Sequence, residues 1–479
     1  MRRKTKHLLF LMLGILFANN LLAQDHSKQL PELFLSRLIQ SESISGNEKE
    51  VAGILYEEAT KYGFYLNWFN GADTAWNLCV SLYPLESKKA NVVFLNHLDV
   101  VPPGDTSAWT SSPFSGEIND GKVFGRGAID CKGLAVMQLY ALIALKDSIK
   151  DKELAHNFSV LFVSGEETGD GRGSEYITSK YLELLNPVVI YGEGGSGISN
   201  PLEGILSPDL YGISLAEKSA LWLQLEVEQK ASGHGAIPPA LYANKKLIRY
   251  LTKLMDQPMQ PSFDPLTEEM FKQMGNYIGG LRGFFVKHVN WMLVWPLVKK
   301  HFREGEAFHP FVYNTFVVTQ LSSGAGVKNQ ISNSATAVLD CRLLPGHETE
   351  KFINKLRRLS NNKLKIKILE SSPASKPSPK TIYYEAFSEA IKYYSPTCSV
   401  IPYLFPASTD NNIFRAKGVP VYGCIPANFS QEEIASVHNV NEQIKVSSLY
   451  QGIKVYTKLC LTISKYNHEL QVLLKTDIK

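Results

Sequence analysis

The sequence predicts a two-domain α/β protein: a mixed, mainly parallel sheet with helices on both faces, and an inserted α+β domain. Three observations predict this fold. The 479 residues exceed what one core usually supports. Apolar runs at 92–95, 158–164 and 187–191 alternate with helical patterns, as strands buried in a parallel sheet do. Near residue 217 the strands begin to alternate apolar and polar residues, and the first pattern resumes after residue 371.

The first part of the main domain is predicted at 28–214. Residues 28–65 carry leucines at helical spacing on both sides of a Ser/Gly break at 43–46, which indicates two helices. The remaining elements alternate: strands at 77–83 and 92–95, a helix at 133–148, a strand at 158–164, a helix at 176–185 and a strand at 187–191. This order favours parallel strands at the centre of the sheet.

The inserted domain is predicted at 215–371, and the main domain returns at 372–479 through a Pro/Ser/Lys-rich linker. Inside the insert we expect strands at 220–228, 313–320, 335–342 and 363–369 and helices at 240–255 and 348–359. After it we expect a helix at 381–393, a strand at 418–422 and a closing helix at 446–464. Such an order suggests a small α+β domain placed inside the first.

An extra segment at 258–310 lengthens the insert. Its apolar run, 292–298, follows Lys287, His288 and Asn290, so it does not form a membrane span. Two interpretations stay open. The run is an amphipathic helix packed on the inserted domain, or it is an apolar lip that meets acyl chains or a membrane surface.

Residues 1–23 have the pattern of a secretory signal peptide. Basic residues precede an apolar run at 8–18, and Ala23 is a small residue at a plausible cleavage point. The run is shorter than the roughly 20 residues of a spanning helix. We therefore expect an exported protein, periplasmic or secreted, with no membrane span in the mature chain; an uncleaved anchor is the alternative.

The composition is that of a globular protein, with 44% hydrophobic and 20% charged residues. The formal net charge of +4 is small, and no basic cluster is interleaved with aromatic residues, so nucleic acid is not expected as a partner. The six cysteines form no dense framework, which leaves both free thiols and one or two disulfides open. Cys131 as a nucleophile is disfavoured because no histidine motif lies nearby.

Acidic residues and histidines follow several of the predicted strands. His97 and Asp99 point the same way because side chains alternate along a strand. The full set is His97, Asp99, Asp130, Glu166, Glu167, Glu193 and His438. Open α/β sheets place their sites just beyond the carboxyl ends of their strands. Imidazole and carboxylate ligands without thiolate suit zinc, with cobalt or manganese as substitutes. One carboxylate that bridges two ions and another that acts as base predict metal-assisted hydrolysis.

These residues stand in recognisable motifs. They are 97–99 (HLD), 125–133 (GRGAIDCKG), 165–167 (GEE), 232–234 (SGH), 340–346 (DCRLLPG) and 408–410 (STD). In this order, from Leu30 to Ser464, the chain resembles the aminoacylase–carboxypeptidase family of two-zinc metallopeptidases, which have a zinc exopeptidase-like fold. The extra segment is most similar to the branch of carboxypeptidase S and secreted N-acyl amino acid hydrolases.

The resemblance implies a role for each site residue. His97 and Glu193 would hold one zinc, Glu167 and His438 the other, and Asp130 would bridge them. Asp99 would support His97, and Glu166 would be the general base. His234, from the inserted domain, would stabilise the oxyanion, and Asn329 would reach the substrate. In many relatives this histidine comes from a partner subunit, which implies a homodimer through the inserted domain. The Asp130–Cys131 bond would be a cis peptide.

One departure concerns substrate recognition. Relatives often carry arginine where this chain has Asn412, and that arginine binds the substrate's free carboxylate. Arg342 or Arg415 would have to replace it. We predict hydrolysis of an amide bond in short peptides, as by a carboxypeptidase or dipeptidase. The alternatives are an N-acyl amino acid hydrolase and a catalytically silent peptide-binding protein of the same fold.

Two further features of the sequence bear on the site. Residues 192–197 fit the glycine pattern of a dinucleotide site, but 198–201 start a helix poorly, so a nucleotide is not expected. The loop between Asp99 and Asp130 carries Trp109 and Phe114, which we expect to form a wall of the cleft.

Overall fold

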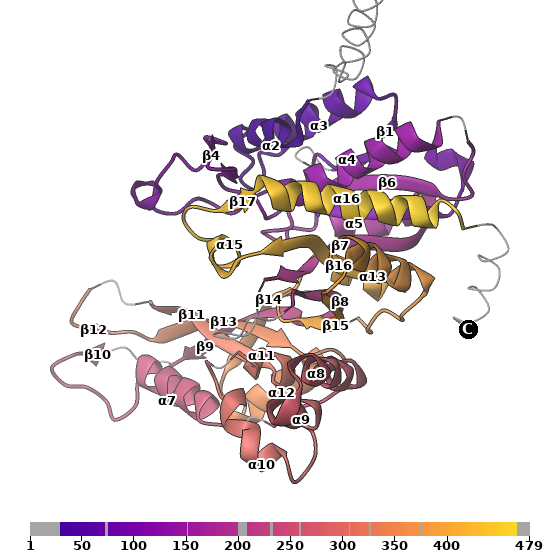
Figure 1. Ribbon diagram of the computed structural model, residues 1–479. Coiled ribbons are helices and arrows are strands. Elements are labelled where there is room, and N and C mark those ends of the chain that lie inside the picture. Colours follow the sequence, from indigo (N-terminus) through magenta and orange to yellow (C-terminus); the bar gives the residue numbers. More distant parts are fainter. Residues whose placement is uncertain are drawn as a thin grey trace, which may run out of the picture.

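The computed structural model describes residues 29–71, 75–150, 152–199, 208–229, 233–257, 260–305, 307–324, 327–373 and 375–466. The predicted signal peptide lies outside them. Two bodies are visible, a main domain with a large sheet and an inserted domain below it (Figure 1). Within the described residues, no helix combines the length and the apolar character needed to cross a bilayer.

An eight-stranded mixed sheet forms the centre of the main domain, in the order β1-β2-β6-β3-β7-β16-β8-β15. The strands are β1 (Tyr65–Trp68), β2 (Leu78–Ser81), β3 (Asn91–His97), β6 (Asn157–Val163), β7 (Pro187–Ile198), β8 (Leu210–Glu217), β15 (Ser399–Phe405) and β16 (Val421–Phe429). The four central strands, β6, β3, β7 and β16, run parallel. β3 and β6 are buried along their whole length, which explains their continuous apolar sequence.

Helices cover both faces of this sheet. Leucines and aromatic residues of five helices share one apolar cluster with Val92, Phe94 and Phe162. These helices are α2 (Pro31–Gln40), α3 (Lys49–Lys61), α4 (Lys132–Ile149), α13 (Ile382–Tyr394) and α16 (Val446–Ile463). On the other face lie α5 (Ser174–Lys180), α6 (Leu182–Leu185) and α14 (Asn411–Ala416). The predicted α/β fold class is confirmed.

Local sequence signals begin several helices. Thr381 accepts a hydrogen bond from the backbone N–H of Tyr383 at the start of α13. A capping box of Ser430 and Glu433 starts α15 (Gln431–Ser436). A small sheet lies beside the main one and consists of β4 (Ile118–Asn119), β5 (Lys122–Phe124) and β17 (Gln443–Lys445). Two 3-10 turns, η1 (Leu85–Ser87) and η2 (Thr106–Ala108), lie in loops.

The inserted domain contains a four-stranded antiparallel sheet in the order β11-β13-β9-β14. Its strands are β9 (Ser219–Glu228), β11 (Thr315–Ser323), β13 (Ser334–Leu343) and β14 (Lys365–Ser371). Alternate residues of β9, from Leu221 to Val227, pack against α7 (Ala243–Met255) and α12 (Thr349–Leu359). A separate short pair, β10 (Gly233–His234) and β12 (Gln330–Ile331), extends from one end (Figure 1).

The apolar run 292–298 does not pack on the inserted domain alone, because Trp295 and Val298 contact the apolar cluster of the main domain, which corrects one interpretation of the sequence. The extra segment forms α8 (Pro265–Ile278), α9 (Gly280–Lys287), α10 (Trp295–Val298), η3 (Lys299–Phe302) and α11 (His309–Val312). Leu266, Met270 and Phe271 of α8 belong to the apolar cluster of the main domain, and α8 lies along β15. Because β15 is an edge of the large sheet, α8 covers strand groups that would otherwise be open.

Three strands of the large sheet were missed in the sequence. β1 has only four residues, and both β1 and β15 are only partly buried, so their patterns are weak. β8 was taken for the end of the first part, but it continues to Glu217, and the chain crosses into the inserted domain at Lys218. β16 begins at Val421, three residues later than the predicted strand, and runs on to Phe429. All six cysteines are free thiols.

Candidate metal centre

His97 is the last residue of β3, at the carboxyl edge of the sheet, and its ring is buried. Its Nδ1 lies 2.9 Å from the backbone oxygen of Asp99. A carbonyl only accepts, so Nδ1 carries the proton and Nε2 presents a lone pair. Nε2 lies 2.9 Å from Asp130 Oδ1 and 3.8 Å from Glu193 Oε1. In the neutral ring, three acceptor atoms therefore face one another, an arrangement that suits a cation bound between them.

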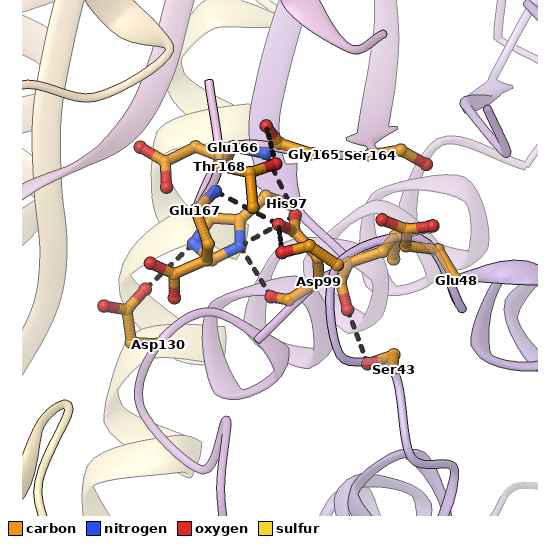
Figure 2. Close-up of polar contacts among 12 residues, drawn as sticks. Ser43, Glu48, His97, Asp99, Asp130, Ser164, Gly165, Glu166, Glu167 and Thr168 are labelled. Carbon is orange, nitrogen blue, oxygen red and sulfur yellow. Dashed lines mark hydrogen bonds and ion pairs between the residues drawn. The ribbon is translucent and has the colours of Figure 1, made fainter. Parts of the chain in front are cut away.

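The carboxylate of Asp99 organises the loop after β6 (Figure 2). It accepts hydrogen bonds from the backbone N–H groups of Glu166 and Glu167, at 3.1 Å each, and from Ser45 Oγ at 2.7 Å. Its Oδ1 stands 3.6 Å from Nδ1 of His97. Asp99 thus contacts His97 mainly through its backbone oxygen, while its side chain holds the two glutamates in place.

Asp130 sits on a turn that a buried carboxylate holds from behind. Glu442 accepts hydrogen bonds from the backbone N–H groups of Gly127, Ile129 and Asp130 at 3.0–3.1 Å. It also pairs with Arg126 at 2.8 Å. The Asp130–Cys131 peptide is cis, as the resemblance implied. Glu442 therefore positions the carboxylate that lies between the two halves of the site.

The second half of the site comes from two distant loops. His438 Nε2 lies 3.1 Å from Glu167 Oε1 and 3.2 Å from Asp130 Oδ2. Two groups of ligand atoms therefore share Asp130, with all atoms of each within 4.8 Å of one another. One contains His97 and Glu193, and the other contains Glu167 and His438. The predicted ligands are brought together in the predicted pairs.

The charge balance of these groups fits divalent cations. The site gathers four carboxylates, and none of them has a Lys or Arg ion pair among the described residues; they are Asp130, Glu166, Glu167 and Glu193. Like charges packed this closely and buried are unfavourable unless cations balance them. Cys131 is near the first group, but its thiol is buried and its pKa is raised by that burial, so the oxygen and nitrogen donors remain the better ligands.

The pKa values of these side chains reflect the same crowding. Burial, followed by the charge of Asp130, raises the pKa of Glu193 well above its usual value, and burial does the same for Glu166. Hydrogen bonds to Asp130 and Glu167 raise the pKa of His438 to about 10. Burial opposes ionisation of Asp130, yet hydrogen bonds from His438 and His97 hold its pKa below the usual value. Bound cations would act on these groups as the histidine charges do here.

A cavity of about 520 Å³ opens over the ligands between the two domains. The inserted domain contributes Trp222, Arg342 and Glu370 to its lining. Arg342 is held by Asp340 through two contacts of 2.9 and 3.1 Å. It is the one arginine that lines this cavity among the described residues.

Two other residues considered for carboxylate binding lie elsewhere. Arg415 is buried and forms an ion pair of 2.9 Å with Glu217, so its guanidinium is engaged behind the cavity. Asn412 is also buried and donates to the backbone oxygen of Pro373 at 2.7 Å. Of the two arginines proposed to replace the missing one, only Arg342 reaches the cavity.

The expectation that Trp109 and Phe114 form a wall of the cleft is wrong. Neither Trp109 nor Phe114 lines the cavity. Trp109 instead lies under the guanidinium of Arg126, whose Cζ is 5.2 Å from the ring centroid. It supports the turn before Asp130 because Arg126 is the partner of Glu442.

His234 and Asn329 come together, but apart from the ligands. They lie on and beside the short strand pair of the inserted domain, and Asn329 Nδ2 is 3.2 Å from His234 Nε2. Both side chains are exposed, and neither lines the cavity. A role in catalysis therefore requires movement of the inserted domain or a contribution from another subunit.

Sequence reasoning missed two buried carboxylates that position the site. One is Glu442. The other is Glu217, which accepts from the backbone N–H and the hydroxyl of Thr409 at 3.0 Å and from Asn411 at 3.2 Å. Asn411 in turn donates to the backbone oxygen of Glu193 at 2.7 Å. Neither glutamate lies in a motif, so nothing in the sequence marks it as buried. Its burial and its hydrogen-bond partners are seen only in the folded structure.

The glycine pattern at 192–197 lies inside β7, which continues to Ile198. A dinucleotide site needs these glycines at a turn from a strand into a helix, whereas all six positions here lie within a strand. Gly195 has no room for a side chain, since a Cβ there would lie 2.2 Å from the backbone oxygen of Gly212. These glycines allow close strand packing.

Comparison with known proteins agrees with the metal-hydrolase site described above. The chain is 25% identical over 396 residues to the probable carboxypeptidase S-like 2 of Dictyostelium discoideum, covering 80% of this chain and 73% of that protein. It is 25% identical over 369 residues to the N-fatty-acyl-amino acid synthase/hydrolase PM20D1 of Mus musculus, covering 76% and 72%.

The fold agrees with that of a solved relative. The M20 family metallo-carboxypeptidase Sso-CP2 of Sulfolobus solfataricus superposes with a TM-score of 0.70 at 21% identity, covering 92% of this chain and 100% of that one. The Peptidase family M20/M25/M40 matches residues 93–462, most of the chain. With its paired ligand groups sharing Asp130, the chain belongs to this family of dinuclear metallopeptidases and is a metallohydrolase of peptides or N-acyl amino acids.

Proposed function

We propose that this enzyme is a zinc-dependent carboxypeptidase that releases a C-terminal amino acid from short peptides. One observation carries the proposal. A cavity with paired metal-ligand groups in its floor and Glu166 beside them also contains a single arginine, Arg342. A carboxypeptidase substrate ends in a free carboxylate beside the scissile amide, and arginine is suited to bind it.

The site residues support an amide hydrolysis. Bound at His97, Asp130, Glu167, Glu193 and His438, two divalent ions would polarise the scissile carbonyl and acidify a water. Glu166 lines the cavity and has no side-chain hydrogen bond among the described residues, so it is free to take a proton from the attacking water. It then gives that proton to the leaving amine. Asp99 holds its backbone during both transfers.

The metal is proposed to be zinc, from the chemistry of the donors. Two imidazoles and carboxylate oxygens, with no thiolate required, match the common ligands of catalytic zinc. Cobalt or manganese would be accepted by the same donors. Metal analysis of the purified protein measures both the identity and the stoichiometry, and two ions per chain are expected.

An N-acyl amino acid hydrolase is the second candidate. Its substrate has the same amide and the same free carboxylate, but an acyl chain replaces the peptide. The specific observation in its favour is the apolar part of the cavity lining, which includes Trp222, Phe405 and Ile413. The mouse relative carries an N-fatty-acyl-amino acid activity in its name.

We also propose export through residues 1–23 and a homodimer through the inserted domain. The outer strand β11 is an unpaired edge and exposes Val317 and Leu321, so it can pair with a second copy. A dimer would allow His234 of one chain to serve a neighbouring site. Measuring the molar mass in solution tests this, and a monomer would contradict it.

A substrate panel tests the proposed activity. The purified enzyme would be assayed on blocked dipeptides with free or amidated C-termini and on N-acyl amino acids of increasing chain length. We expect cleavage of the free-carboxylate dipeptides and at least a 100-fold loss on amidation. Arg342→Ala should remove most of that discrimination, whereas Arg357→Ala, at a partly exposed residue of α12 outside the cavity lining, should not.

Other outcomes of the panel assign the alternatives. Faster turnover of long N-acyl amino acids than of dipeptides would replace the carboxypeptidase assignment by the second candidate. Cleavage of amidated and free substrates at equal rates would exclude a carboxylate-binding role for Arg342. Binding of peptides without turnover, in a protein that holds two metal ions, would indicate a silent binding protein.

A further inference from the structure

The extra segment presents an unusual surface at residues 280–303, called here the basic apolar tip. Met292 is 85% exposed, Leu293 79%, Leu281 73% and Leu297 64%. Phe284 and Trp291 add exposed rings. No described residue covers these side chains. Contiguous exposed apolar groups on a soluble protein mark a surface that meets a partner.

The tip is held firmly by the protein behind it. Val294 is buried, and Trp295 contacts Phe263 and Phe302 with ring centroids 5.5 and 5.2 Å apart. Phe302 in turn contacts Phe271 of α8 at 5.6 Å. Because these rings fill the space behind the tip, the exposed residues on the same turns cannot turn inward and become buried. They are presented outward by a packed aromatic base.

The rings on the surface are also fixed in place. His288 lies between Phe284 and Trp291, at centroid distances of 4.5 and 4.0 Å. His288 Nδ1 is bonded to the backbone oxygen of Phe284 at 2.9 Å. Tryptophan at the border of an apolar patch is typical of residues that sit at the headgroup level of a bilayer.

The charge of the tip points to one kind of partner. Residues 280–303 contain five basic side chains and no Asp or Glu; the basic ones are Arg282, Lys287, Lys299, Lys300 and Arg303. Lys287 donates to Asn276, and none of the five has an ion pair among the described residues. Exposed Leu, Met and Trp framed by unpaired cations is the composition of segments that bind the surface of anionic membranes.

The position of the tip permits such contact. α9 and α10 lie at the end of the molecule opposite α2 and α3 (Figure 1). A flat surface could approach this end without meeting the main domain first. A protein partner with an acidic groove or a second copy of the chain would need a complementary shape, whereas a bilayer accepts a convex apolar tip without one.

We propose that the basic apolar tip docks the protein onto the surface of an anionic phospholipid bilayer. Met292, Leu293 and Leu297 enter the interface, Trp291 lies at headgroup depth, and Lys299, Lys300 and Arg303 contact lipid phosphates. This contact is interfacial, without a spanning helix, and leaves the metal centre outside the bilayer. It concerns where the enzyme works rather than which bond it cleaves.

Vesicle co-sedimentation tests the docking on the full chain. Vesicles of phosphatidylcholine with 30% phosphatidylglycerol would be compared with pure phosphatidylcholine, at low and high salt. The variant K299Q/K300Q/R303Q should bind the anionic vesicles about 100-fold more weakly, because each cation near such a surface contributes roughly a fivefold factor. M292S/L293S should weaken binding by at least 10-fold.

Matched variants control for general charge and hydrophobicity. K355Q/K363Q/K367Q removes three exposed cations from the inserted domain, and I248S/M255S removes two exposed apolar side chains from α7. Both should bind vesicles as the wild type does. Thermal unfolding checks that all four variants fold. Because turnover is not measured, failure here is distinguishable from failure of the proposed reaction.

Hydrogen exchange locates the contact, since the apolar run at 8–18 could also hold the full chain on vesicles. Anionic vesicles should slow exchange of amides in 288–298. Absence of this protection, or tip variants that bind as tightly as the wild type, would overturn the proposal. Equal, salt-insensitive binding to neutral vesicles would overturn its anionic specificity. Loss of self-association in M292S/L293S without vesicle binding would instead make the tip an interface between copies.

Discussion

The two domains differ in how closely they bring their proposed site residues together. In the main domain, the ligands His97, Asp130 and Glu193 converge within hydrogen-bonding range or close to it. In the inserted domain, His234 and Asn329 are exposed and bonded to each other, away from the cavity. The difference teaches that the metal site is preorganised by the core, whereas the proposed oxyanion group must be delivered.

Buried carboxylates explain why the main domain is ready. Asp99 and Glu442 accept hydrogen bonds from several backbone N–H groups of loops that carry site residues, and Glu217 accepts from one, that of Thr409. Backbone donors cannot rotate away, so loops held this way keep a fixed shape. In the part of the chain that the structure describes, the pair of β10 and β12 has no such carboxylate, and its ladder has two residue pairs. It is the part of the site best able to move.

Of the variants that test this difference between the domains, Glu166→Gln should have the largest effect on turnover. Loss of the general base is expected to lower kcat by about 10²- to 10⁴-fold. Metal content should stay at the wild-type level, because Glu166 is not among the proposed ligands. Glu175→Gln, at the rim of the same cavity, is a control that keeps the proposed base. Wild-type turnover in the Glu166 variant would remove it from the mechanism.

His234→Ala tests delivery by the inserted domain. Removing one oxyanion donor should lower kcat by about 10²- to 10³-fold with little change in metal content. His301→Ala, an exposed histidine of the extra segment, serves as the control. An unchanged kcat would mean that the inserted domain supplies no oxyanion group.

Mixing the two inactive variants then identifies the source of the histidine. If a partner subunit supplies it, a hybrid dimer of H234A and E166Q chains contains one complete site and regains part of the activity. If each chain supplies its own, the mixture stays inactive. The experiment requires subunit exchange, which a change in the mass of a tagged partner verifies.

Glu442→Gln should have the smallest effect on turnover. Its clearest effect should be on how firmly the main domain holds the metal ligands in place. An amide offers one acceptor oxygen and turns its own donors toward backbone N–H groups, so the turn before Asp130 loosens. We expect about 10- to 100-fold weaker metal binding and about 1–3 kcal/mol lower unfolding free energy. Glu432→Gln is the exposed control. Unchanged metal affinity would show that Glu442 does not position Asp130.

Local patterns were enough to predict much of the fold. The fully buried strands β3 and β6 and the long helices α4 and α16 carry patterns set by their own burial, and each was found near its observed bounds. β15 was missed because its burial depends on α8, a segment more than a hundred residues away. Only the tertiary structure shows that α8 covers this edge of the sheet and that the basic apolar tip beyond it is exposed.

By itself, the sequence determined the fold class and the family, and it predicted the metal ligands, because those residues lie in short motifs beside strand ends. Only the tertiary structure decided what surrounds them. It placed Arg342 in the cavity, engaged Arg415 with Glu217, and assigned Glu442 to the turn of Asp130. The physical reason is that a short motif identifies side chains able to bind metal or react. Burial and hydrogen-bond partners, in contrast, depend on contacts between residues distant in the chain.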